Sequence, residues 1–256
     1  MKRILTFILT LTLALSFCVN SFAAATTATA SETQTGTSEA QTDTSKAQAG
    51  TSEAQTDTSK VQAGASYGIS NLSGAPDIVA ESAVVMDANT GTILYGKEAD
   101  TKRYPASITK VMTALLAVEN CKMSDVITYS NAAVNGIEAG SSTAGINVGA
   151  KLTVEDSLYA LMLVSANEAA AAIAEHISGS TTEFAKLMTK RAKELGCTNT
   201  HFANPHGLQD ENHYTTAHDM ALIAQAAYQN ETFRIIIGTK MYTIPPTNKH
   251  AEETVL

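Results

Sequence analysis

Two residues with catalytic potential, Ser107 and Lys110, stand one helical turn apart. Pro105 just before them is typical of the first turn of a helix, and positions i and i+3 share one helix face. A serine hydroxyl is a weak nucleophile that needs a neighbouring base. Lysine can be that base only where burial or nearby positive charge removes its proton. The spacing suits a nucleophile and its base, but read alone it more often indicates a helix-start serine followed by a solvated lysine.

A second group, Ser165-Ala166-Asn167, follows an apolar stretch later in the chain. Together with Ser107 and Lys110 it supplies a nucleophile, a base, a proton relay and an amide that can bind substrate. That set suits acyl transfer at a carbonyl group. Read alone, the triplet also fits a capping Ser and Asn at a helix junction.

The two groups and their flanking segments resemble the serine-type D-alanyl-D-alanine carboxypeptidases, the low-molecular-mass penicillin-binding proteins. These enzymes combine Ser-x-x-Lys with Ser-x-Asn and Lys-Thr-Gly. The resemblance extends from about Ala80 to Leu256. It is carried by the nucleophile segment, the entry hairpin and the segments after Ser-x-Asn, which are Tyr104–Thr113, Ala83–Gly91, Asn204–Leu208 and Tyr214–Ala221.

The resemblance implies a role for each residue. Ser107 would attack the carbonyl of a D-Ala-D-Ala peptide, and Lys110 would take its proton. Ser165 would relay a proton to the leaving D-Ala, and Asn167 would bind the peptide. The oxyanion would lie against backbone N–H groups, including that of Ser107. Peptidoglycan stem peptides and β-lactam antibiotics are the implied partners, with no cofactor and no metal.

The third motif of that family does not occur in the sequence, which contains neither Lys-Thr-Gly nor Lys-Ser-Gly. We therefore expect a partial domain that stops before this motif and lacks the C-terminal strands of the sheet. One alternative is a catalytically impaired remnant associated with the cell wall. Another is a β-lactamase, but no segment resembles the Glu-containing loop of the class A enzymes.

The order of the expected elements predicts an α+β fold, and the resemblance implies the β-lactamase/transpeptidase-like type, with an antiparallel sheet and a helical cluster. Apolar, β-prone runs at Ser82–Asp87 and Thr92–Tyr95 flank the turn residues Ala88–Gly91, so we expect a hairpin. Two further strands are expected at Phe233–Ile237 and Met241–Ile244. Helices are expected from Pro105, from Thr153 with a capping arrangement, and at Glu168–His176, Phe184–Leu195 and Thr216–Tyr228.

The N-terminal third of the chain predicts export. A basic start and an apolar run to Val19 precede small residues at Ser21 and Ala23, which indicates a signal peptide over residues 1–23. A retained membrane anchor is the alternative, although the run is short for a spanning helix. Residues 24–75, rich in Thr, Ser, Ala and Gln with one repeat, predict a disordered linker, either a spacer or an insert without a role. Residues 76–256 then form the peptidase domain.

The amino-acid composition excludes some classes of binding partner. The formal net charge of −8 argues against nucleic acid, which requires a basic surface. Membrane contact is expected only through an uncleaved signal peptide, so we expect the protein outside the cytoplasm, at the bacterial surface or wall. Beyond the signal region, Cys121 and Cys197 are interpreted as thiols rather than a disulfide. The histidines lack metal-site spacing and are interpreted as surface or structural.

Overall fold

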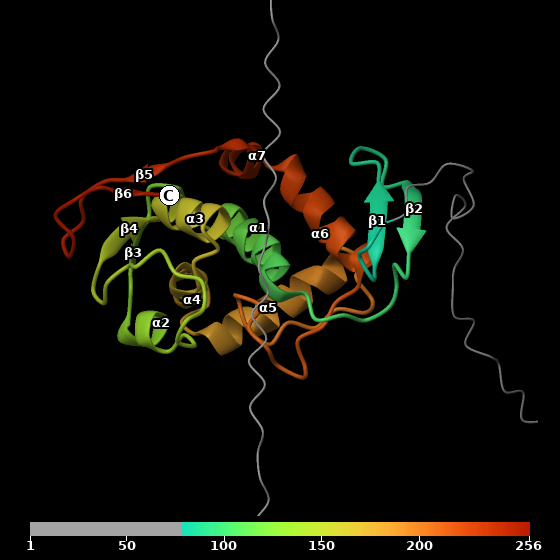
Figure 1. Cartoon of the computed structure of the whole chain (residues 1–256), viewed down its shortest axis with the longest axis horizontal. Coiled ribbons are helices and arrows are strands. Elements are labelled where there is room, and N and C mark those ends of the chain that lie inside the picture. The colour runs from blue at the N-terminus through green and yellow to red at the C-terminus, as the bar shows by residue number, and fades with distance from the viewer. Residues whose placement is uncertain (1–77) are drawn as a thin grey trace, which may run out of the picture. The chain divides into compact units, whose positions relative to one another are not determined.

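A computed structural model describes residues 78–256 of the chain (Figure 1). The predicted signal peptide and the predicted linker lie outside the described residues. Helices and strands are intermixed along the chain, which confirms the α+β class. The helices are η1 (Ala106–Thr109), α1 (Lys110–Asn120), α2 (Asn131–Asn135), α3 (Val154–Leu163), α4 (Asn167–Ser178), α5 (Thr181–Glu194), α6 (Ala217–Gln229) and α7 (Glu231–Gly238).

The strands pair as three antiparallel ribbons: β1 (Ala83–Met86) with β2 (Ile93–Lys97), β3 (Val126–Thr128) with β4 (Lys151–Thr153), and β5 (Thr243–Ile244) with β6 (Thr254–Val255). The first ribbon is the predicted hairpin. Its turn is closed by Asp87, whose Oδ1 accepts hydrogen bonds from the backbone N–H of Asn89 and of Thr90. Short polar side chains of this kind commonly close turns by bonding nearby backbone.

Helix α1 lies at the centre of the helical cluster and packs against α3, α4 and α6 (Figure 1). Met112, Leu115 and Leu116 on α1 are almost completely buried. In α4 the run Ala169–Ala172 is buried as well, and small side chains let neighbouring helices approach closely. The core that surrounds α1 therefore holds Lys110, the first residue of this helix, and the preceding turn η1 with Ser107 in a fixed position.

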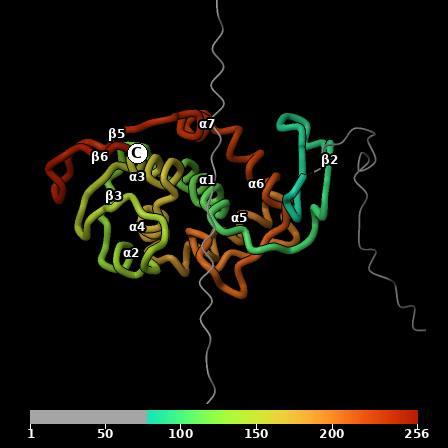
Figure 2. Tube along the Cα trace, viewed as in Figure 1, coloured from blue at the N-terminus to red at the C-terminus, as the bar shows by residue number. Residues whose placement is uncertain are grey.

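The β1–β2 hairpin packs against α6 at one end of the described domain, while the β5–β6 ribbon lies at the other (Figure 1). Figure 2 traces the chain from α7 back along α3 to its last residue. The aromatic ring of Tyr242 stacks on that of Tyr159 of α3, with ring centroids 3.7 Å apart. This stack and the hydrogen bond from the Tyr242 hydroxyl to Asp156 attach the last segment to α3.

The capping arrangement predicted at the start of α3 is confirmed. The Thr153 hydroxyl accepts from the backbone N–H of Asp156, and the Asp156 carboxylate accepts from the backbone N–H of Thr153. The two bonds satisfy N–H groups that the first helical turn would leave unpaired.

One predicted strand is wrong, because Phe233–Ile237 lies within helix α7. The Asn230 side chain caps this helix by accepting from the backbone N–H of Phe233. Phe233 and Ile236, three residues apart, are buried, whereas Ile235 and Ile237 are exposed. A helical face therefore decides the structure of this β-branched run. The other predicted strand, Met241–Ile244, is confirmed only for its second half.

Candidate active site

The predicted nucleophile and base are brought together at the junction of η1 and α1. Pro105 precedes η1, Ser107 lies exposed within it, and Lys110 is the first residue of α1. Residues i and i+3 eclipse one another in a 3-10 turn. Lys110 Nζ is accordingly 3.3 Å from Ser107 Oγ, in a hydrogen bond.

Lys110 is 2% exposed, so the alternative of a solvated lysine is wrong. Burial lowers the pKa of Lys110 from its ordinary 10.5 to about 8, while the charge of Glu168 acts in the opposite direction. The amine also donates a 2.9 Å hydrogen bond to the carbonyl oxygen of His206. A lysine with a pKa of about 8 is neutral in an appreciable fraction of molecules near neutral pH, as a general base requires.

The loop that contains Asn204–Leu208 contacts the first turns of α1 next to Ser107. Besides the bond from Lys110 to His206, the Thr113 hydroxyl donates to the carbonyl oxygen of Pro205 at 2.6 Å. Both acceptors are backbone carbonyls, so the loop conformation itself orients the first turns of α1. The Asn204 side chain holds that conformation by accepting from the backbone N–H of Gly207.

A buried histidine connects the same loop to Thr109, the residue just before Lys110. His213 Nδ1 accepts from the backbone N–H of Ala203, so its ring proton lies on Nε2 and is donated to Thr109 Oγ1 at 2.8 Å. Burial lowers the pKa of His213 to about 4. Burial and the nearby charge of Lys110 lower that of His206 to about 4 as well. Both imidazoles are therefore neutral at neutral pH, and His213 has the structural role expected from the sequence.

Ser165 lies in the short connection between α3 and α4, and Asn167 is the first residue of α4. Ser165 has a φ of 58°, a left-handed backbone that non-glycine residues seldom adopt and that is concentrated at functional sites. Asn167 begins α4, yet no side chain caps this helix, so the capping alternative is wrong. Ser165 Oγ and Asn167 Oδ1 are buried and have no hydrogen-bond partner among residues 78–256. The hydrogen-bonding capacity of these two atoms is therefore unused within the described residues.

Sequence reasoning missed several residues that support these four. Thr109, Thr113 and Glu168 were not singled out, and the carbonyl groups of Pro205 and His206 leave no signal in side-chain chemistry. The positions of Thr109 and Thr113 inside the segment that resembles the carboxypeptidases were the available hint. Glu168 could have been noticed as an acidic residue inside an otherwise apolar, Ala-rich stretch.

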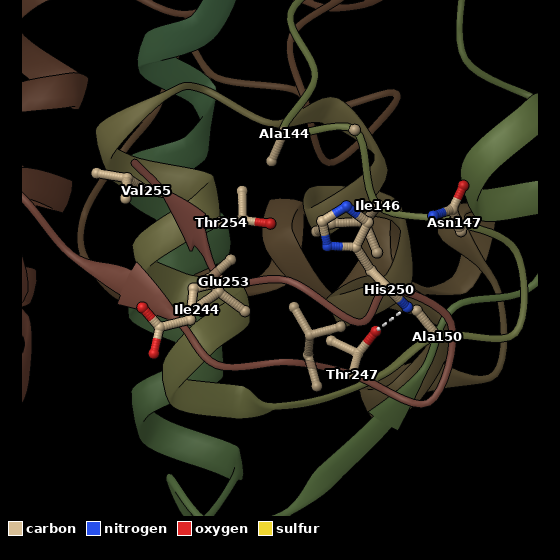
Figure 3. Close-up of a pocket in the computed structure, with 12 residues that line it drawn as sticks. Ala144, Ile146, Asn147, Ala150, Ile244, Thr247, His250, Glu253, Thr254 and Val255 are labelled. Atoms are coloured by element: carbon tan, nitrogen blue, oxygen red, sulfur yellow. Dashed lines mark hydrogen bonds between the residues drawn. The ribbon is translucent and has the colours of Figure 1, made fainter.

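A pocket lies between the segment Ala144–Asn147 and the chain that follows β5 (Figure 3). Thr247, His250 and Thr254 line it, and none of the four predicted site residues does. Across the described part of the chain, no three His, Cys, Asp or Glu side chains gather as a metal site would require. None of the helices described is long and apolar enough to cross a membrane. Cys121 and Cys197 are free thiols, as expected.

Comparison with known proteins identifies the family. Residues 70–251 match the model of the D-alanyl-D-alanine carboxypeptidases. The chain belongs to this family. Among curated members, DacF of Bacillus subtilis is 42% identical over 165 residues, which cover 62% of this chain and 42% of that protein. DacA of Escherichia coli is 37% identical over 163 residues, covering 60% and 40% of the two chains.

Solved structures agree with this assignment. The Streptomyces K15 DD-transpeptidase has a TM-score of 0.65 and 35% identity, over 71% of this chain and 72% of that structure. The carboxypeptidase DacD of Francisella tularensis has a TM-score of 0.61 and 38% identity, over 66% and 41%. The described residues therefore have the transpeptidase-like fold expected from the sequence. The chain spans about two fifths of the length of DacF and DacA.

Proposed function

We propose that this chain is a serine-type D-Ala-D-Ala carboxypeptidase that removes the terminal D-Ala from peptidoglycan stem peptides. The observation that carries the proposal is the 3.3 Å hydrogen bond between Ser107 Oγ and the buried amine of Lys110. Membership of the carboxypeptidase family supports the substrate class.

In the proposed reaction, the neutral amine of Lys110 accepts the Ser107 proton as Oγ attacks the carbonyl carbon of the D-Ala-D-Ala amide. The tetrahedral intermediate collapses to an ester on Ser107. Ser165 donates its hydroxyl proton to the departing nitrogen and receives in its place the proton held by Lys110, so that free D-Ala leaves and the lysine is neutral again. Water then hydrolyses the ester, which returns Oγ to its protonated form and releases the shortened peptide.

Substrate binding falls to Asn167, whose buried amide oxygen has no partner within residues 78–256 and suits a backbone N–H of the peptide. The N–H of Ser107 belongs to the first turn of η1, where backbone donors have no helical acceptor. It can donate to the oxyanion that forms on the attacked carbonyl. Because a β-lactam contains an amide of related geometry, it acylates Ser107 in the same way.

The proposed site of action is the bacterial wall, outside the cytoplasm. The predicted signal peptide over residues 1–23 supports export, and the predicted linker over 24–75 separates it from the peptidase domain at 76–256. Function on exported peptidoglycan is consistent with the net charge of −8, which disfavours nucleic acid.

A labelled penicillin tests the proposal. We expect one covalent label per chain, lost in Ser107→Ala and retained in Ser178→Ala, a control serine at the end of α4. Release of D-Ala from a D-Ala-D-Ala peptide is expected with the same dependence on Ser107. Unlabelled wild-type chain, or labelling that survives Ser107→Ala, contradicts the proposal and favours a remnant. Rapid release of hydrolysed penicillin, instead of a long-lived adduct, favours a β-lactamase.

A further inference from the structure

A buried carboxyl group that the proposed mechanism does not use lies directly after Asn167. Glu168 is 2% exposed. Its Oε2 is the third buried side-chain oxygen without a hydrogen-bond partner within residues 78–256, beside those of Ser165 and Asn167. All three fall within four consecutive residues. Burial of an acidic side chain costs free energy unless its contacts compensate, so the contacts that Glu168 does make are informative.

The other oxygen of this carboxyl group, Oε1, fastens a segment from a distant part of the chain. It accepts from the Thr143 hydroxyl and from the backbone N–H of Ala144, both at 2.7 Å, and from the N–H of Ile146 at 3.4 Å. The neighbouring Asn167 N–H donates to the carbonyl oxygen of Ser142 at 3.0 Å. The start of α4 therefore holds Ser142–Ile146 through adjacent residues.

On its other side, this segment contacts the hydrophobic core through the partly buried Ala144 and Ile146. Ala144 and Ile146 line the pocket shared with Thr247 and His250 (Figure 3). Gly145 adopts a φ of 74°, and nothing lies within 4 Å of the position a side chain would take there. The hydrogen bonds to Glu168 therefore act together with this packing to set the conformation of the segment.

The same carboxyl group acts electrostatically on the nucleophile's base. The charge of Glu168 raises the pKa of Lys110, against the larger lowering that burial causes. The other titratable groups near this pair are Tyr129, whose pKa burial raises strongly, and His206, which burial and Lys110 keep neutral. Glu168 is therefore the acidic group that balances the charge of Lys110.

We propose that Glu168 is a positioning residue of this site: its carboxyl group fastens Ser142–Ile146 beside Asn167 and holds a negative charge near the Lys110 amine. This inference rests on the proposed function for its catalytic meaning. Its two physical parts, the fastened segment and the charge, are measurable without any substrate.

The test compares Glu168→Gln, which keeps an acceptor oxygen for Thr143 and Ala144 but loses the charge, with Glu168→Ala, which loses both. Glu175→Gln, the same change two turns along α4, is the matched control. The titration of Lys110 is followed by the NMR signal of its Cε, assigned with Lys110→Arg. The segment is followed by hydrogen exchange of the Ala144 and Ile146 amides.

We expect Glu168→Gln to move the Lys110 titration to lower pH while the two amides stay protected. Glu168→Ala is expected to accelerate exchange of both amides at least tenfold, and Glu175→Gln to change neither measurement. An unmoved Lys110 titration in Glu168→Gln, or unchanged exchange in Glu168→Ala, overturns the inference. If Glu168→Ala does not fold, Thr143→Val removes one of the same hydrogen bonds from the other side, and faster exchange at Ala144 is expected there.

Penicillin acylation then connects the two parts to catalysis. Relative to wild type, Glu168→Gln should acylate faster at acidic pH, because more Lys110 is neutral there, and Glu168→Ala should acylate more slowly than Glu168→Gln at every pH. Unchanged rates in both variants overturn the positioning role. A wild-type chain that is not acylated contradicts the proposed function instead, and the titration and exchange results still decide the placement of Glu168.

Discussion

The carbonyl oxygen of Ala106 occupies the space that a side chain at Gly207 would need. A Cβ atom added to Gly207 would lie 1.9 Å from that oxygen and 2.9 Å from Thr109 Oγ1. The turn that carries Ser107 and the loop that accepts from Lys110 are thus in direct backbone contact. Ala106 itself has a φ of 50° and Gly207 a φ of 88°. The position of Ser107 therefore depends on a glycine far away in the sequence.

Gly207→Ala should consequently separate the two backbones. We expect a loss of stability above the ~1–2 kcal/mol that a left-handed alanine costs by itself, and a loss of penicillin acylation. Thermal unfolding and labelling measure the two effects. Gly179→Ala is the control, because Gly179 also has a positive φ but nothing lies within 4 Å of an added Cβ. Equal effects of the two substitutions would show that the contact with Ala106 is unimportant.

The rate of acylation by penicillin should change with pH as the Lys110 amine loses its proton. Its pKa of about 8 means that the neutral base is depleted as pH falls below 8. We expect the acylation rate to rise about tenfold per pH unit well below pH 8 and to level off above it. Rates measured from pH 5 to 9.5 with labelled penicillin check this.

Lys110→Arg supplies the control for that profile. A guanidinium stays protonated throughout the range, so we expect an acylation rate lower by about 10²–10⁴-fold. A substantial rate that still rises toward pH 8 in this variant would assign the titration to another group.

The contact between Ser107 and Lys110 could be predicted from the sequence, whereas the loop contacts could not. Ser107 and Lys110 are brought together by local helix geometry, so their spacing alone indicates the contact. The loop contacts are different, because the acceptors at Pro205 and His206 are backbone carbonyls that any residue supplies. Only the chain's tertiary fold determines which carbonyls reach Lys110 and Thr113. The φ of Ser165 is likewise a tertiary result.

His213 should stabilise the fold most at neutral pH. Its pKa in the folded state, about 4, is below the ordinary 6.5. As the pH falls, His213 therefore binds a proton near pH 6.5 in the unfolded chain but only near pH 4 in the folded chain. Stability is lost as pH falls through this window. We expect chemical unfolding at pH 7, 5.5 and 4.5 to show the decline.

In His213→Ala this pH dependence should be shallower, with His206 contributing what remains in the same direction. At pH 7 the substitution leaves the Thr109 hydroxyl and the Ala203 N–H without their partner, at a cost of about 1–3 kcal/mol. The exposed His250 provides the control, since His250→Ala should leave the slope unchanged. An undiminished slope in His213→Ala would contradict the assignment.

Tyr242 should anchor the last segment to α3 in two separable ways. Tyr242→Phe keeps the stack on Tyr159 but loses the hydrogen bond to Asp156 Oδ1, for an expected cost of about 1 kcal/mol. Tyr242→Ala loses the ring as well and should cost more. Thermal unfolding measures both, with the exposed Tyr228→Phe as control. Similar unfolding of Tyr242→Ala and wild type would mean that the segment does not depend on this contact.

The fold divides in the same way into local and non-local information. The β1–β2 hairpin and the Thr153 cap are settled within a few residues, and both agree with the patterns that predicted them. Helix α7 differs, because its β-branched run favours a strand locally, and the helix prevails since Phe233 and Ile236 find buried positions on one face. The pairing of β3 with β4 joins segments whose patterns are too short to recognise alone.

Three long-range hydrogen bonds hold η1 and the first turn of α1 in place. They join Lys110 to His206, Thr113 to Pro205 and Thr109 to His213, which are separated by 96, 92 and 104 positions in the chain. Closing loops of this length requires the intervening helices to be in place, and long-range closure of this kind slows folding. A chain still emerging from the ribosome therefore has its serine and lysine long before it has an activated pair. Covalent labelling by penicillin would thus report the completion of folding, and an unfinished chain would not react.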